Sequence, residues 1–188
     1  MQNKTTISSV TSLPLIIAAM VLALLAVIFM SPPAQAETMK KVSGFAETAS
    51  LGNRFEIESG NLMLKQSSND QVLKIAETMV RDHTASESKL RTALGATATD
   101  ADILPTSLDA AHNKLMDKLR TTSMTHTDRV YLDIQAQAHR DSIRAFEEYV
   151  MKGDNPELRQ YAQDSLPTKR AHLEMIVTAQ NNLGPQPN

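Results

Sequence analysis

The chain contains no cysteine, and its only aromatic residues are four phenylalanines and three tyrosines. A protein without cysteine has no disulfide bonds, no thiol catalysis, no cysteine-ligated iron–sulfur cluster and no attached c-type haem. A small exported domain often depends on disulfides, but a core of apolar side chains must stabilise this one.

Several other signals are also missing. The 19 basic residues do not outnumber the 21 acidic residues, so there is no basic footprint for nucleic acid or anionic lipid. No stretch alternates apolar and polar residues for long enough to predict a sheet. The sequence contains neither a Gly-x-Ser-x-Gly run around a nucleophile nor a glycine-rich phosphate loop. These absences leave no catalytic residue to assign.

The N-terminus has the pattern of a secretory signal in residues 1–36. Lys4 gives a positive start, Leu15 to Met30 is an uninterrupted apolar run, and Ala34-Gln35-Ala36 fits an A-x-A cleavage site. We expect cleavage before Glu37, a helical domain over residues 37–183 and a disordered tail over residues 184–188. The alternative is an anchor that is not cleaved, because the apolar run is long for a signal. After cleavage the chain would contain 18 basic and 21 acidic residues. The mature protein would then be periplasmic or otherwise exported and would have no membrane span.

The rest of the chain has the 3.6-residue periodicity of amphipathic helices. It predicts four long helices and one short helix, at 40–66, 69–95, 107–120, 128–152 and 155–180. The first two long helices are joined by a short turn, as are the last two, and a crossover of roughly thirty residues separates the pairs. This order of short, long and short connections is typical of a ferritin-like four-helix bundle. The predicted fold is therefore all-α and ferritin-like, with an additional short crossover helix.

Four segments carry a resemblance to a known family. They are Phe55-Glu56-Ile57-Glu58, then Ala76-Glu77-Thr78-Met79-Val80-Arg81-Asp82-His83, then Asp128-Arg129-Val130-Tyr131 with Gln135 and His139, and finally Leu166-Pro167 with His172-Leu173-Glu174-Met175. In their order, these segments resemble the exported bacterial "domain of unknown function 4142" family. The resemblance implies a ferritin-like fold and an exported location. It implies no activity, substrate or catalytic residue.

Four ionisable residues fall on the predicted apolar stripes, one on each long helix: Glu58, His83, His139 and His172. Imidazole and carboxylate groups that converge in a bundle can hold a transition metal ion. The usual di-iron pattern, Glu-x-x-His, is absent, because Val80, Ala136 and Lys169 stand three residues before the histidines. The alternative is a metal-free layer of side chains that hydrogen-bond to one another.

Copper is a further hypothesis, because three His–Met pairs share helix faces: Met79 with His83, His112 with Met116, and His172 with Met175. Methionines that fill gaps in a helical core give the same pattern. For function, the sequence favours a non-catalytic exported protein that binds an unknown protein or envelope partner, as in envelope stress. The alternative is a metal-binding or metal-handling bundle built on the inward-facing His and Glu residues.

Overall fold

The computed structural model describes residues 33–95 and 104–183, and side chains from residue 44 onward. All regular elements within these ranges are helices, so the all-α prediction is confirmed. The helices are α2 (Pro33–Gln66), α3 (Asp70–Ala93), α5 (Ala110–Thr121), α6 (Met124–Lys152) and α7 (Pro156–Asn182). The predicted signal, apart from the start of α2, and the predicted tail lie outside the described residues. None of the described helices has both the length and the apolar character required to cross a membrane.

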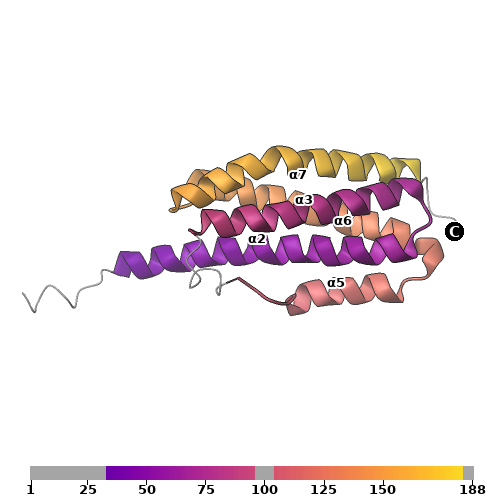
Figure 1. Ribbon diagram of the computed structural model, residues 1–188, viewed down its shortest axis with the longest axis horizontal. Helices are drawn as coiled ribbons and strands as arrows, with labels where there is room; N and C mark the ends of the chain where they lie inside the picture. Colours follow the sequence, from indigo (N-terminus) through magenta and orange to yellow (C-terminus); the bar gives the residue numbers. More distant parts are fainter. Residues whose placement is uncertain (1–32, 96–103, 184–188) are drawn as a thin grey trace, which may run out of the picture. The chain divides into compact units, whose positions relative to one another are not determined.

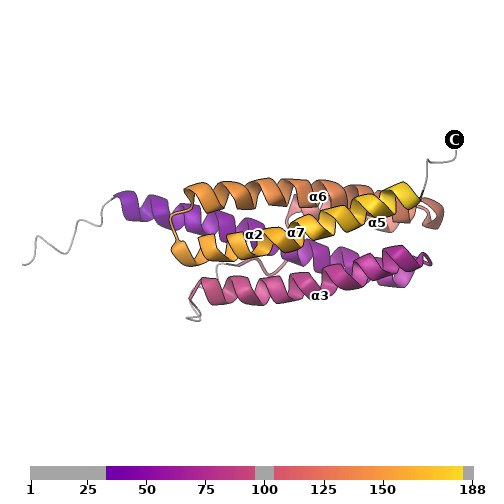
Figure 2. The same ribbon diagram turned by 90° about the horizontal axis from the view of Figure 1, so that it is seen from above.

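Thr38–Asn188 forms one compact unit, in which the long helices α2, α3, α6 and α7 lie side by side (Figures 1 and 2). Short connections join α2 to α3 and α6 to α7, while a longer segment that includes α5 joins α3 to α6. The short helix α5 packs on α6, and its His112 ring lies 5.3 Å from the ring of Phe55 on α2. The predicted order of connections is therefore present, whereas the ferritin-like assignment itself stays a prediction.

Local signals explain most of the helix ends. Asn69 caps α3 by accepting hydrogen bonds from the backbone N–H groups of Gln71 and Val72, and Gly95 follows that helix with a φ of +71°. Asn155 caps α7, whose first residue is Pro156. Pro167 does not break α7, which is helical on both sides of it.

Three predicted helix starts were wrong. Helix α2 begins at Pro33, seven residues before the predicted start. Helix α5 begins at Ala110, three residues after the predicted start, and Asp109 caps it by accepting a hydrogen bond from the backbone N–H of His112. Helix α6 begins at Met124, four residues before the predicted start. The first turn of α6 is largely exposed, with Met124 75% accessible, so it lacks the apolar periodicity from which a helix is read.

The core consists of two apolar clusters. One cluster includes Phe55, Met79, Leu132 and Ile176, and the other includes Phe45, Leu90, Phe146 and Leu158. Along α3, α6 and α7, the histidines lie in sequence between the residues of the two clusters. A polar layer therefore separates the two halves of the core, and it holds the candidate site.

Candidate metal centre

Three buried histidines from three helices converge in the polar layer. They are His83 on α3, His139 on α6 and His172 on α7, and none is more than 4% exposed. One ring nitrogen from each lies within 4.8 Å of the other two. The structure thus brings together three of the four residues that the sequence singled out.

The fourth residue, Glu58, does not belong to the cluster. Its side chain is only half-buried, and it offers no oxygen to the group of potential ligands. The carboxyl group near the histidines comes from Glu56, whose Oε1 lies 3.8 Å from Nδ1 of His139. Because successive helical residues differ by about 100°, Glu58 lies about 200° around α2 from Glu56. The prediction that Glu58 joins the histidines was therefore wrong.

Hydrogen bonds fix the orientation of each imidazole ring. Nδ1 of His83 lies 3.0 Å from Oδ1 of Asn53, and the amide nitrogen of Asn53 donates to Glu87. Since Oδ1 only accepts, Nδ1 of His83 must carry the proton. The remaining nitrogen, Nε2, holds the lone pair and is buried without a hydrogen-bond partner in the described residues.

The other two histidines follow the same logic. Nδ1 of His139 donates to the backbone carbonyl of Gln135 at 2.9 Å, which leaves the lone pair on Nε2. Nε2 of His172 donates to the carboxylate of Asp82 at 2.9 Å, which leaves the lone pair on Nδ1. Asp82 has the ordinary aspartate property of being ionised at neutral pH, and its hydrogen bond from Arg81 lowers its pKa further, so Asp82 is an acceptor.

The two lone-pair nitrogens of His139 and His172 lie 3.3 Å apart. With both rings neutral, no proton lies between them, and two lone pairs repel unless a cation separates them. Two ligands at tetrahedral positions, each about 2.0–2.1 Å from zinc, are about 3.3–3.4 Å apart. The observed spacing therefore fits one edge of a tetrahedral metal site.

The three rings are held in the uncharged form that metal ligands need. Burial lowers the pKa of His83 well below its usual value and lowers that of His139 to about 3, and the positive charge of Lys169 acts in the same direction. Burial also lowers the pKa of His172, although its hydrogen bond to Asp82 opposes this shift. Protons therefore compete little for these nitrogens at neutral pH.

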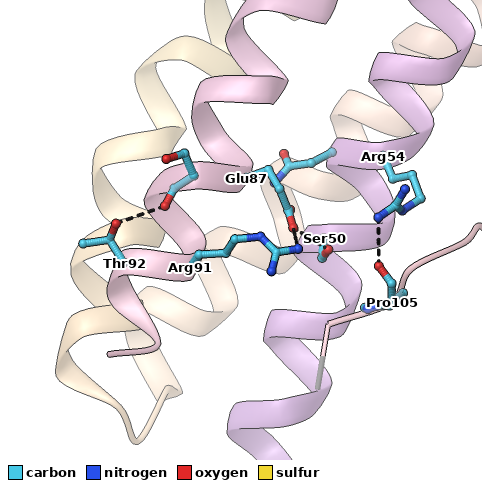
Figure 3. Close-up of polar contacts among 8 residues, drawn as sticks. Ser50, Arg54, Glu87, Arg91, Thr92 and Pro105 are labelled. Atoms are coloured by element: carbon cyan, nitrogen blue, oxygen red, sulfur yellow. Dashed lines mark hydrogen bonds and ion pairs between the residues drawn. The ribbon is translucent and has the colours of Figure 1, made fainter. Parts of the chain in front are cut away.

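A hydrogen-bond network between α2 and α3 supports His83. Glu87 accepts from Ser50, from Asn53 and from Arg91, at 3.0, 3.2 and 3.0 Å (Figure 3 shows Ser50, Glu87 and Arg91). Asn53 is 1% exposed and lies between this carboxylate and the ring of His83. The network fixes the amide so that its oxygen faces the imidazole, which is the type of support that metal-bound histidines usually have.

Two further ionisable groups lie beside the cluster. Burial raises the pKa of Glu56 to about 8, against the effects of Gln135 and Lys169, and it lowers the pKa of Lys169 to about 8. Nζ of Lys169 lies 4.3 Å from the centre of the Phe146 ring, at cation–π distance. The site thus joins three neutral ligands to a buried acid and a buried base.

Comparison with known proteins identifies the family. The sequence profile of the family described as "Domain of unknown function (DUF4142)" matches residues 29–178, which is most of the chain. The chain belongs to this family. No curated protein and no solved structure matches it.

Sequence reasoning missed four site residues of this DUF4142 chain: Asn53, Glu56, Asp82 and Lys169. Lys169 lies on the same stripe of α7 as His172, so its inward position followed from the periodicity. Asp82 precedes His83 in the sequence, yet its side chain contacts His172 on another helix. Pairings of this kind join residues far apart in the chain, so no local pattern predicts them.

The methionines of the copper hypothesis have an ordinary structural place in the DUF4142 bundle. Met79 and Met116 are fully buried in the apolar cluster that contains Phe55, and Met175 packs against that cluster. This is the position expected of methionines that fill gaps in a core.

Proposed function

We propose that the protein binds one divalent transition metal ion through His83, His139 and His172. The observation that supports this most strongly is the common design of the three rings. In each ring, one nitrogen donates to a fixed acceptor and the other keeps its lone pair, and one nitrogen of each ring lies within 4.8 Å of the other two. Metal-binding histidines typically have this arrangement.

Zinc is the reference ion for this proposal. Imidazole ligands suit zinc, copper, nickel and iron, and the 3.3 Å between the nitrogens of His139 and His172 is the spacing of two ligands on tetrahedral zinc. Structural zinc sites are usually closed by four protein ligands, whereas three protein ligands leave one position for water or another molecule. The site is accordingly of the open type, which suits a protein that carries, buffers or uses the ion.

We also propose that the site acts outside the cytoplasm, on the strength of the leader-like pattern in residues 1–36. The first function that the sequence favoured, binding of a protein or envelope partner, stays a prediction without a named partner. A metal-free polar layer is the competing account of the cluster. In that case His172 is doubly protonated, donates to both His139 and Asp82, and turns the 3.3 Å contact into a hydrogen bond.

Calorimetric titration of the untagged, metal-free protein with Zn(II) tests the proposal. We expect one ion per chain, a higher melting temperature with zinc, and at least 100-fold weaker binding in His83→Ala, His139→Ala and His172→Ala. His112→Ala is the matched control, because this histidine lies outside the cluster and should leave zinc binding unchanged.

The competing account predicts a different result. In a metal-free layer, the same three substitutions lower the melting temperature of the apo protein, but zinc stabilises none of the proteins. The absence of stoichiometric binding of Zn(II), Cu(II), Ni(II) and Fe(II) would refute the proposed function.

A further inference from the structure

A cavity of about 630 Å³ reaches the polar layer from the side of α2, α5 and α6. Its walls are largely apolar and include Leu51, Phe55, Ile134 and Phe146. Its lining also includes Glu56, His139 and Lys169, so it reaches the candidate metal centre. Cavities of this volume, apolar with a few converging polar groups, are typical of sites for small molecules.

Lys169 is the unusual feature of this cavity. Its side chain is 6% exposed, and its ammonium group lies over the Phe146 ring and is attracted by the carboxyl group of Glu56. The Oε2 atom of Glu56 is buried without a hydrogen-bond partner in the described residues. Burial of ionisable groups is costly unless hydrogen bonds satisfy them, so a ligand in this cavity that bonds to Lys169 and Glu56 would offset that cost.

The charges indicate the sign of that ligand. Burial lowers the pKa of Lys169 to about 8, so most of its positive charge remains at pH 7. A divalent ion on the neighbouring histidines would add two positive charges, and Glu56 is the only buried carboxyl group among the described residues that line this cavity. The exposed aspartates at the lining, Asp109, Asp133 and Asp141, already accept hydrogen bonds from other side chains. The inner end therefore favours an anion.

We propose that this cavity binds a small organic carboxylate with an apolar body, whose head group lies against Lys169 beside the three histidines. The apolar walls receive the body, and the ammonium group receives the carboxylate. This inference places a second ligand beside the proposed metal site. Binding of the carboxylate does not require the metal, and only an effect of zinc on that binding rests on the proposed function. A second cavity of about 490 Å³ also touches His83 and Lys169, but most of its lining residues, such as Ser86, Gln160 and Asp164, have polar side chains.

The experiment measures binding of 3-phenylpropionate to the full protein by calorimetry, with and without one equivalent of zinc. The neutral 3-phenylpropionamide tests the need for charge, and inorganic phosphate tests the need for the apolar body. Lys169→Met removes the ammonium group but keeps the length of the side chain. Lys89→Met is the matched control, since Lys89 is exposed and lines only the smaller cavity.

A second pair of variants tests the cavity itself without touching a charge. Ala138→Leu fills the larger cavity, and Ala85→Leu places the same side chain in the smaller one. We expect the metal-free wild type to bind the carboxylate at least tenfold tighter than the amide. Lys169→Met should remove this preference, Ala138→Leu should weaken binding at least tenfold, and the two controls should bind as the wild type does.

Equal affinity for carboxylate and amide, equal affinity for phosphate, or undiminished binding in Ala138→Leu would overturn the proposal. So would a failure of the metal-free protein to bind the carboxylate at all. If zinc binds but the carboxylate does not, this inference fails and the metal site stands. If the carboxylate binds but zinc does not, the metal site fails and this inference stands.

Discussion

Replacement of Asp82 by alanine removes the acceptor for the Nε2–H group of His172. It leaves the other hydrogen bonds that support the proposed metal centre in place. The Asp82 side chain is 26% exposed, so water can replace the lost acceptor in the apo protein. We therefore expect the free energy of unfolding to change by less than about 1 kcal/mol. Loss of a residue that orients a metal ligand typically weakens metal binding by about 10–100-fold, which equals about 1.4–2.7 kcal/mol.

Competition between the protein and a zinc chelator, measured at fixed pH, gives the affinity of each variant. Asp82→Asn keeps an oxygen that accepts from His172 and should lose only a few-fold in affinity. Arg81→Ala breaks the 2.7 Å ion pair with Asp82 without touching a histidine, and it should bind zinc as the wild type does. Equal zinc affinity in Asp82→Ala and the wild type would refute the role assigned to this carboxylate.

Three further predictions concern the bundle itself. Gly60→Ala should destabilise the protein by about 1–3 kcal/mol, because a Cβ there would lie 2.8 Å from the Val80 side chain. Gly52→Ala should stabilise it by about 0.5–1 kcal/mol, because a Cβ there would lie in open space. Urea unfolding of the two variants checks both predictions. Phe146→Ala should cost about 3–5 kcal/mol, since Phe146 is 2% exposed, and a loss below about 1 kcal/mol in the same assay would contradict its core position. Burial lowers the pKa of His139 from 6.5 to about 3, so below pH 6.5 the unfolded apo protein binds more protons than the folded one. This residue alone should therefore lower the free energy of unfolding by about 2 kcal/mol at pH 5 relative to pH 7. Urea unfolding of His139→Gln at both pH values should show the loss of that part of the pH dependence.

The sequence predicted the helices and the three histidines well, for one physical reason. A buried face on a long helix repeats every 3.6 residues, so His83, His139 and His172 could be placed inward without any tertiary information. The same reasoning failed on α2, because this helix is covered on two sides. Phe55 faces α5, while Asn53 and Glu56 face the polar layer. The apolar stripe that contains Phe55 also contains Glu58, so periodicity pointed to Glu58 instead of Glu56.

The orientation of the imidazole rings was beyond the reach of the sequence. It depends on Asn53 and Asp82, which lie on helices other than those of the histidines they hold. The position of Lys169 under the Phe146 ring likewise joins two helices. Periodicity places a residue on a face, but only packing decides which residue of the next helix it meets.

Zinc-edge anomalous diffraction from crystals grown with one equivalent of Zn(II) tests the central claim most directly. The account predicts one strong anomalous peak within about 2.0–2.1 Å of Nε2 of His83, Nε2 of His139 and Nδ1 of His172, with a fourth position held by a non-protein ligand. A fully occupied peak at an exposed residue such as His126, and none between the three histidines, would contradict it.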